Sequence, residues 1–96
     1  MKKAYLLVYS AMGADRQAVK VWANESPLVL TWRYDLPNTF YLVSEASAAE
    51  LYADFAQGSR KSWRCLVTEV SENRQGRLPM DTWYFLRNKR SKPDKA

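Results

Sequence analysis

Basic side chains surround one tryptophan at residues 60–64, and the residue types of this stretch are the best suited in the sequence to a chemical role. Arg60 and Lys61 precede Trp63, and Arg64 follows it. Lysine and arginine bind phosphate groups and an indole ring stacks on a nucleobase, so the combination is typical of contacts with single-stranded nucleic acid. The alternative is a solvated loop that leads into a strand whose tryptophan belongs to the core.

Further basic residues follow this patch. Arg74 and Arg77 extend it, although Glu72 dilutes their charge. The net charge of +5 is concentrated near the C-terminus, since residues 87–96 hold five basic residues and one acidic residue, whereas residues 1–86 hold ten basic and nine acidic residues. A basic end of this kind is either a phosphate-binding arm or a solvated terminus. The candidate nucleic-acid contacts there are Arg87, Lys89 and Arg90.

Acidic residues provide the one remaining route to catalysis. The sequence has no histidine and a single cysteine, Cys65, which excludes a Cys–His pair, a Ser–His–Asp triad and a zinc ligand set. A divalent cation needs several oxygen ligands, and no acidic residues occur at a metal-binding spacing. We therefore predict no catalytic residue, no metal ligand and no cofactor. The acidic residues considered are Asp15, Asp35, Glu45, Glu69, Glu72 and Asp81.

The middle of the sequence carries the clearest folding signals. An aromatic and β-branched run predicts a strand over 39–44, and apolar residues at helical spacing predict a helix over 48–57. Ser47 and Glu50 have the spacing of a capping box, in which each side chain accepts a hydrogen bond from the other residue's amide. Gly58 is expected to end the helix in the left-handed conformation.

The flanking segments extend this pattern. Continuous apolar residues predict a strand over 4–9, and alternation of the two faces predicts strands over 28–34 and 63–70. Between the first two strands, apolar residues at helical spacing behind an aspartate N-cap predict a helix over 15–24.

The C-terminal part of the domain is ambiguous. Aromatic residues at 83–85 favour a strand by propensity. Pro79 as a first helical residue and Asp81 in the first turn favour a short helix. We prefer the helix.

The predicted order of elements is β-α-β-β-α-β with a short C-terminal helix. This order indicates an α+β ferredoxin-like fold, a split βαβ arrangement with an antiparallel sheet and two helices on one face. The first and third strands are expected to be central, and the alternating strands, which carry Arg33 and Arg64, are expected to be edges. Residues 1–86 then form a single domain, and residues 87–96 a basic, disordered tail.

The sheet face opposite the two helices is expected to be apolar. A contiguous apolar face usually marks an interface. We therefore expect a homodimer formed through sheet faces or edge strands. The residues assigned to this face are Val29, Thr31, Tyr41, Val43, Leu66 and Thr68.

The N-terminal residues resemble the start of a secretory signal only in part. Lys2 and Lys3 precede an apolar run, but that run is short, has a tyrosine at each side and lacks a good cleavage site. We interpret it as the first strand. No stretch is long enough to span a membrane, and a lone cysteine fits a reducing cytoplasm.

Several segments share patterns with one known family: Tyr-Leu-Leu-Val-Tyr (5–9), Thr-Phe-Tyr-Leu-Val (39–43) before Ser-Ala-Ala-Glu-Leu (47–51), Cys-Leu-Val-Thr-Glu-Val (65–70) and Gly-Arg-Leu-Pro-Met-Asp-Thr-Trp (76–83). They resemble the small ferredoxin-like proteins related to the CRISPR adaptation nuclease subunit and its stand-alone relatives. The resemblance implies a homodimer that contacts the nucleic-acid backbone. In the nuclease members an aspartate closes the first strand after a tyrosine and is proposed to bind a metal ion. Here Ser10 follows Tyr9, and serine is a poor ligand for a hard cation, so no catalytic residue carries over.

These observations leave three hypotheses for the function. The first is a small non-catalytic homodimer that contacts nucleic-acid backbone through its basic residues. The second is a protein-interaction or regulatory module that docks through its sheet face and C-terminal segment. The third is a divalent-metal-dependent nuclease that uses Asp15.

Overall fold

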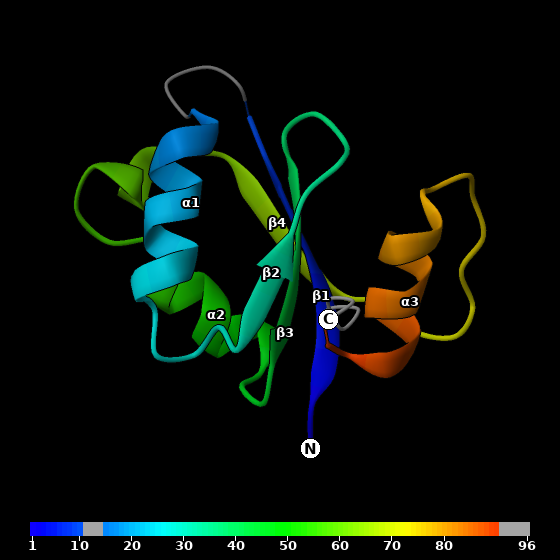
Figure 1. Ribbon diagram of the computed structural model, residues 1–96. Helices are drawn as coiled ribbons and strands as arrows, with labels where there is room; N and C mark the ends of the chain where they lie inside the picture. The colour runs from blue at the N-terminus through cyan, green and yellow to red at the C-terminus, as the bar shows by residue number, and fades with distance from the viewer. Residues whose placement is uncertain (11–14, 91–96) are drawn as a thin grey trace, which may run out of the picture.

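A four-stranded antiparallel sheet forms the centre of this small α+β protein (Figure 1). The computed structural model describes residues 1–10 and 15–90. The strands lie in the order β2-β3-β1-β4, so the first and third strands are central, as predicted from their continuous apolar sequences. The strands are β1 (Lys3–Tyr9), β2 (Thr31–Arg33), β3 (Thr39–Ser44) and β4 (Cys65–Glu69).

Helices cover both faces of the sheet. Figure 1 shows α1 (Arg16–Glu25) and α2 (Ala48–Phe55) on one side and α3 (Met80–Asn88) on the other. We call these sides the helix-pair face and the α3 face. A 3-10 helix, η1 (Gly58–Ser62), connects α2 to β4 on the helix-pair side. None of the described helices is long and apolar enough to cross a membrane.

Two hydrophobic clusters follow from the alternation of side chains along the central strands. On the helix-pair face, Leu7 and Phe40 pack with residues of α1 and α2. On the α3 face, Tyr41 and Val43 pack with Phe85 of α3. Successive residues of a strand point to opposite faces, which is why neighbouring residues of β3 belong to different clusters.

The helix starts agree with their predicted caps. The Asp15 carboxylate accepts a hydrogen bond from the Ala18 amide at 2.7 Å, at the start of α1. Ser47 Oγ accepts from the Glu50 amide at 3.1 Å, and Glu50 Oε1 accepts from the Ser47 amide at 2.9 Å, which confirms the capping box of α2. These bonds satisfy amides that have no partner within the helix.

The second strand is shorter than predicted. The strand expected over 28–34 is limited to β2, and residues 27–28 form a turn after α1. The Leu28 amide donates to Ser26 Oγ at 3.2 Å, which holds the chain in this turn. Leu28 and Val29 consequently both pack against the helix-pair cluster, so the prediction that Val29 lies on the opposite face is wrong. Alternation does not apply where the backbone is not extended.

Other differences concern the element ends. The helix predicted over 48–57 ends at Phe55, and Gly58, with φ of 56°, takes its left-handed conformation at the start of η1. The stretch at residues 58–62 forms this 3-10 helix, rather than the solvated loop that was considered as the alternative. The strand predicted over 63–70 is limited to β4.

The ambiguous C-terminal segment is helical, as preferred. Its helix α3 runs to Asn88, two residues past the predicted domain boundary at 86, and ends with Lys89 in the left-handed conformation. Residues 11–14 and the tail residues 91–96 lie outside the described part of the chain.

Candidate functional site

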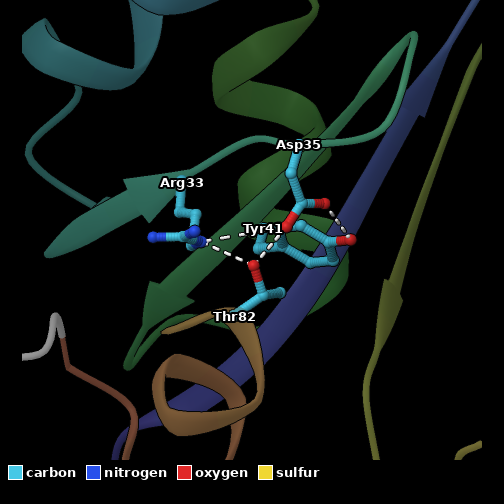
Figure 2. Close-up of polar contacts among 4 residues, drawn as sticks. All are labelled: Arg33, Asp35, Tyr41 and Thr82. Atoms are coloured by element: carbon cyan, nitrogen blue, oxygen red, sulfur yellow. Dashed lines mark hydrogen bonds and ion pairs between the residues drawn. The ribbon is translucent and has the colours of Figure 1, made fainter. Parts of the chain in front are cut away.

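A polar network fastens α3 to the sheet. Figure 2 shows Arg33 of β2, Asp35 of the following turn, Tyr41 of β3 and Thr82 of α3 around one carboxylate. The Tyr41 hydroxyl donates to Asp35 Oδ1 at 2.8 Å, and the Thr82 hydroxyl donates to Asp35 Oδ2. Arg33 Nε donates to Thr82 Oγ1 at 2.6 Å and lies 3.9 Å from Asp35 Oδ2. Three separate segments therefore meet at Asp35.

The network is electrostatically self-consistent. Burial raises the pKa of the Tyr41 phenol, and its hydrogen bond to Asp35 raises the pKa further, so the phenol stays protonated as a donor. Thr82 is fully buried, and its hydroxyl both donates and accepts. Among the described residues, no buried side-chain nitrogen or oxygen lacks a hydrogen-bond partner. The position of α3 is thus fixed by specific bonds as well as by apolar packing.

A groove of about 360 Å³ lies beside α3. Its floor is the α3 face of the sheet, one wall is α3, and the other wall is the chain that leads from β4 to α3. We call it the α3 groove. Most of its lining is apolar, as expected for a ligand site. It is lined by Leu6, Val8, Leu36, Thr39, Tyr41, Val70, Arg74, Gln75, Gly76, Arg77, Leu78, Trp83 and Leu86.

The charged residues of the α3 groove are both cationic. Arg74 and Arg77 line it, and no acidic side chain does. Arg74 Nη1 donates to the Ser71 carbonyl oxygen at 2.8 Å. No hydrogen bond or ion pair is found for Arg77 within residues 1–10 and 15–90. The groove therefore presents positive charge beside an apolar floor.

Exposed apolar side chains continue the groove toward the edge of the sheet. Val8 and Leu36 in its lining are 38% and 42% exposed. Leu66 of the edge strand β4 lies directly opposite Val8 in the β1–β4 register and is 59% exposed. These three residues leave part of the α3 face uncovered, and we call them the apolar strip.

The basic patch predicted at residues 60–64 is divided by the fold. Arg60 Nε donates to the Phe55 carbonyl oxygen at 2.6 Å, and its guanidinium lies 5.6 Å from the Phe55 ring centroid. Trp63 is half-buried against the helix-pair cluster, with its ring centroid 6.0 Å from that of Phe55. Lys61 and Arg64 are exposed. Arg60 and Trp63 thus have packing roles, and Lys61 and Arg64 are the residues of the patch that face solvent.

The C-terminal candidates lie away from this patch. Arg87, Lys89 and Arg90 are at the end of α3 or just beyond it, whereas η1 is on the helix-pair side of the sheet (Figure 1). Arg87 and Arg90 are exposed. The structure therefore does not bring the two predicted groups of cations together on one surface.

Two of the acidic candidates have structural roles in the described part of the chain. Asp15 caps α1, and Asp35 belongs to the network in Figure 2. Within residues 1–10 and 15–90, no group of three or more His, Cys, Asp or Glu residues is placed to hold a metal ion.

A second hollow of about 220 Å³ lies between α1 and α2 and contains Asp54. The Asp54 carboxylate accepts hydrogen bonds from Trp22 Nε1 at 3.0 Å and from Ser26 Oγ at 2.6 Å. These bonds tie the two helices together.

The α3 groove was not predicted from the sequence. Arg74 and Arg77 were considered only as an extension of the basic patch, because their apolar surroundings come from β1, β3 and α3. One sequence signal was available: Thr82, Phe85 and Leu86 are buried at i, i+3 and i+4 of α3, a spacing that marks a helix face packed on another element.

Comparisons with known proteins return no relatives: no family model matches the chain, and neither the curated proteins nor the solved structures contain a significant match.

Proposed function

We propose that this protein is a non-catalytic protein-interaction module and that the α3 groove is its binding site. The observation that carries this proposal is the groove itself, an apolar hollow on a sheet face that three segments of the chain build together. Concave, mostly apolar sites with a few polar groups are the usual form of a binding site.

The apolar strip supports the same function. Val8 and Leu36 line the groove, Leu66 lies opposite Val8 in the strand register, and each of the three is more than one-third exposed. A contiguous exposed apolar patch costs solvation free energy unless a partner covers it. Its position next to the groove favours a partner that contacts both.

The arrangement of elements supports a ferredoxin-like fold. The strand order β2-β3-β1-β4, with α1 and α2 on one face, is the order expected of a split βαβ unit, and α3 is an addition on the other face. Such folds serve many functions, so the function is argued from the groove rather than from the fold.

Nucleic-acid backbone binding is the second candidate function. The net charge of +5 and the exposed side chains of Lys61 and Arg64 favour it. Binding through these residues would weaken steeply with salt, because it depends on counterion release. The resemblance to CRISPR adaptation proteins belongs with this candidate.

The homodimer loses part of its original support. Tyr41 and Val43, which we assigned to a dimer interface, are covered by α3 of the same chain. A dimer through the edge strand β4 remains a proposal. Light scattering of the purified protein tests it.

A blocked groove tests the primary proposal. Gly76 lines the groove, and a Cβ atom at this position meets no heavy atom within 4 Å, so Gly76→Phe adds a ring without a backbone clash. The probe is the apolar sulfonate dye ANS, whose fluorescence rises on binding. We expect the wild-type protein to bind ANS and Gly76→Phe to bind it much more weakly. Ala49→Phe, on the exposed side of α2, is the matched control.

The outcomes separate the two candidates. Equal ANS binding by the wild type and by Gly76→Phe would show that the groove is not the binding site, provided that the two proteins unfold at similar urea concentrations. Fluorescence anisotropy with labelled RNA and DNA tests the second candidate. Salt-sensitive binding that Lys61→Gln with Arg64→Gln removes would favour it.

A further inference from the structure

We propose that the α3 groove and the apolar strip bind a peptide segment of a partner protein in which acidic and apolar side chains are mixed. This inference rests on the proposed function and names the chemistry of the partner. Its apolar side chains cover Leu36, Val8 and Leu66, and its carboxylates lie beside Arg74 and Arg77.

The extent of the apolar surface favours a peptide. The groove spans β1 and β3, and the register pairs Val8 of β1 with Leu66 of β4 at the edge of the sheet. The apolar surface thus crosses at least three strands, which lie about 4.8 Å apart in a sheet. A peptide segment can contact this whole length, whereas a small ligand would fill the groove and leave Leu66 in solvent.

The charges of the site favour an acidic segment. Arg74 and Arg77 line the groove without an acidic neighbour in the lining. Arg64, the residue directly before β4, is a further exposed cation two positions from Leu66 in the sequence. Arginine guanidinium groups pair with carboxylates through two parallel hydrogen bonds. The side chain of Arg77 has no ion pair or hydrogen bond among the described residues and can make such a pair.

A second copy of the chain is a poorer occupant of the same surface. A two-fold interface through the groove would bring Arg74 and Arg77 of both protomers together, and like charges in one interface repel. The basic C-terminal residues Arg87 and Arg90 are equally unsuited to a cationic groove.

Nucleic acid also matches the groove less well. Recognition of single strands needs open aromatic rings for stacking. In the groove, Tyr41 is buried and its hydroxyl is bonded to Asp35, and Trp83 is half-buried against the cluster under α3. The floor therefore offers aliphatic side chains, which suit leucine-like or phenylalanine-like partners.

Selection from a phage-displayed library of random short peptides tests the proposal. The bait is the full chain, and the library is depleted only on the support without bait before each round. We expect the enriched peptides to combine Asp or Glu with large apolar residues. One enriched peptide, labelled with a fluorophore, then gives dissociation constants by anisotropy.

Variants identify the contacts of that peptide. We expect Gly76→Phe to weaken binding more than about tenfold, because it adds a large ring at a residue of the groove lining. Replacing both Arg74 and Arg77 by Gln is expected to weaken it about threefold to tenfold, with a smaller salt dependence than the wild type. Arg87→Gln, an exposed cation outside the groove lining, is the matched control and is expected to leave the affinity unchanged.

Each other outcome overturns a defined part of the argument. Enriched peptides that lack acidic residues, but bind wild type and not Gly76→Phe, would contradict the acidic partner and leave the groove as the site. Peptides that bind Gly76→Phe as well as wild type would contradict the groove itself. An oligonucleotide that displaces the labelled peptide at physiological salt with higher affinity would contradict a peptide partner in favour of nucleic acid.

Discussion

The Thr82 hydroxyl donates a hydrogen bond to the Asp35 carboxylate, and this bond ties the C-terminal helix to the turn between β2 and β3, 47 residues earlier in the chain. Arg33 donates to the same hydroxyl, so Thr82 links a cation and an anion that approach each other only to 3.9 Å. Helix α3 is therefore an integral part of the domain, held by polar bonds at its first turn and by apolar packing farther along.

Thr82→Val is expected to lower the free energy of unfolding by about 1–3 kcal/mol. The substitution keeps the shape of the side chain but leaves Asp35 and Arg33 with one partner fewer in a half-buried site. Urea unfolding followed by far-UV circular dichroism measures the change. Thr82→Ser keeps the hydroxyl and is expected to lose less. Thr68→Val, on the exposed side of β4, is the control and should change stability by less than about 0.5 kcal/mol. A loss for Thr82→Val no greater than this would contradict the role of the network.

Tyr41→Phe is expected to change the dependence of stability on alkaline pH. The folded state raises the pKa of the Tyr41 phenol above its ordinary value of 10.0, because burial and the bond to Asp35 favour the neutral form. Between the unfolded and the folded pKa the folded protein binds more protons, so stability falls as pH rises above about 10. Tyr41→Phe removes this loss, although it costs about 1 kcal/mol at neutral pH for the missing hydrogen bond.

The measurement is the difference in unfolding free energy between wild type and Tyr41→Phe at a series of pH values. Burial also raises the pKa values of Tyr5 and Tyr9, but both remain in the variant and cancel in this difference. We expect the advantage of the wild type to shrink as pH rises above about 10. A difference that stays constant over this range would show that the phenol titrates alike in both states.

Phe85→Ala is expected to lower the free energy of unfolding by about 3–5 kcal/mol. Phe85 is 1% exposed and packs with Tyr41 and Val43 beneath α3, so its removal leaves a cavity between the helix and the sheet. Met80→Ala in the first turn of the same helix is the control, since Met80 is 85% exposed. If both variants had the same stability, α3 would not be packed on the sheet as described.

Sequence patterns predicted the order of the strands better than which residues lie on each face of the sheet. The continuous apolar runs identified β1 and β3 as central, and Ser47 with Glu50 predicted the start of α2, because these signals are local. The strand predicted over 28–34 was too long. The apolar residues after Pro27 alternate in the sequence, but they are not in a strand and pack together against the helix-pair cluster. A hydrophobic pattern indicates which residues are buried more directly than it indicates the conformation of the backbone.

Local sequence patterns could not predict that α3 covers this face of the sheet or that a groove forms beside it. The helical spacing of Thr82, Phe85 and Leu86 indicated a buried face, but not which surface it covers. Asp35 had a sufficient explanation as a turn residue, and nothing in the sequence pairs it with Thr82. The groove follows from the space between α3, the preceding chain and the sheet, so only the tertiary structure defines it.

Ser47→Ala is expected to lower the free energy of unfolding by about 1 kcal/mol at neutral pH, because the first turn of α2 loses its cap. Hydrogen bonds from the Ser47 amide and side chain hold the pKa of Glu50 below its usual value, and Ser47→Ala keeps the amide but removes the side-chain bond. The part of the stability that depends on ionised Glu50 is therefore present above about pH 4.5 and is lost as pH falls through the lower folded pKa. Unfolding at pH 7 and pH 3 measures this, with Ser62→Ala as the control. A cost that is larger at the acidic pH would contradict the capping box.

Loosening α3 is expected to weaken ligand binding in the α3 groove. Trp83 and Leu86 of α3 line the groove, and the hydrogen bond from Thr82 to Asp35 holds this helix on the sheet. In Thr82→Val the helix opens more often, so the binding-competent population falls and the apparent dissociation constant rises by the same factor. The measurement is ANS affinity together with hydrogen exchange of the α3 amides. Because Thr82 does not line the groove, weaker binding must come with faster exchange at residues 80–88. Unchanged exchange with lost affinity would mean that Thr82 acts on the ligand by another route.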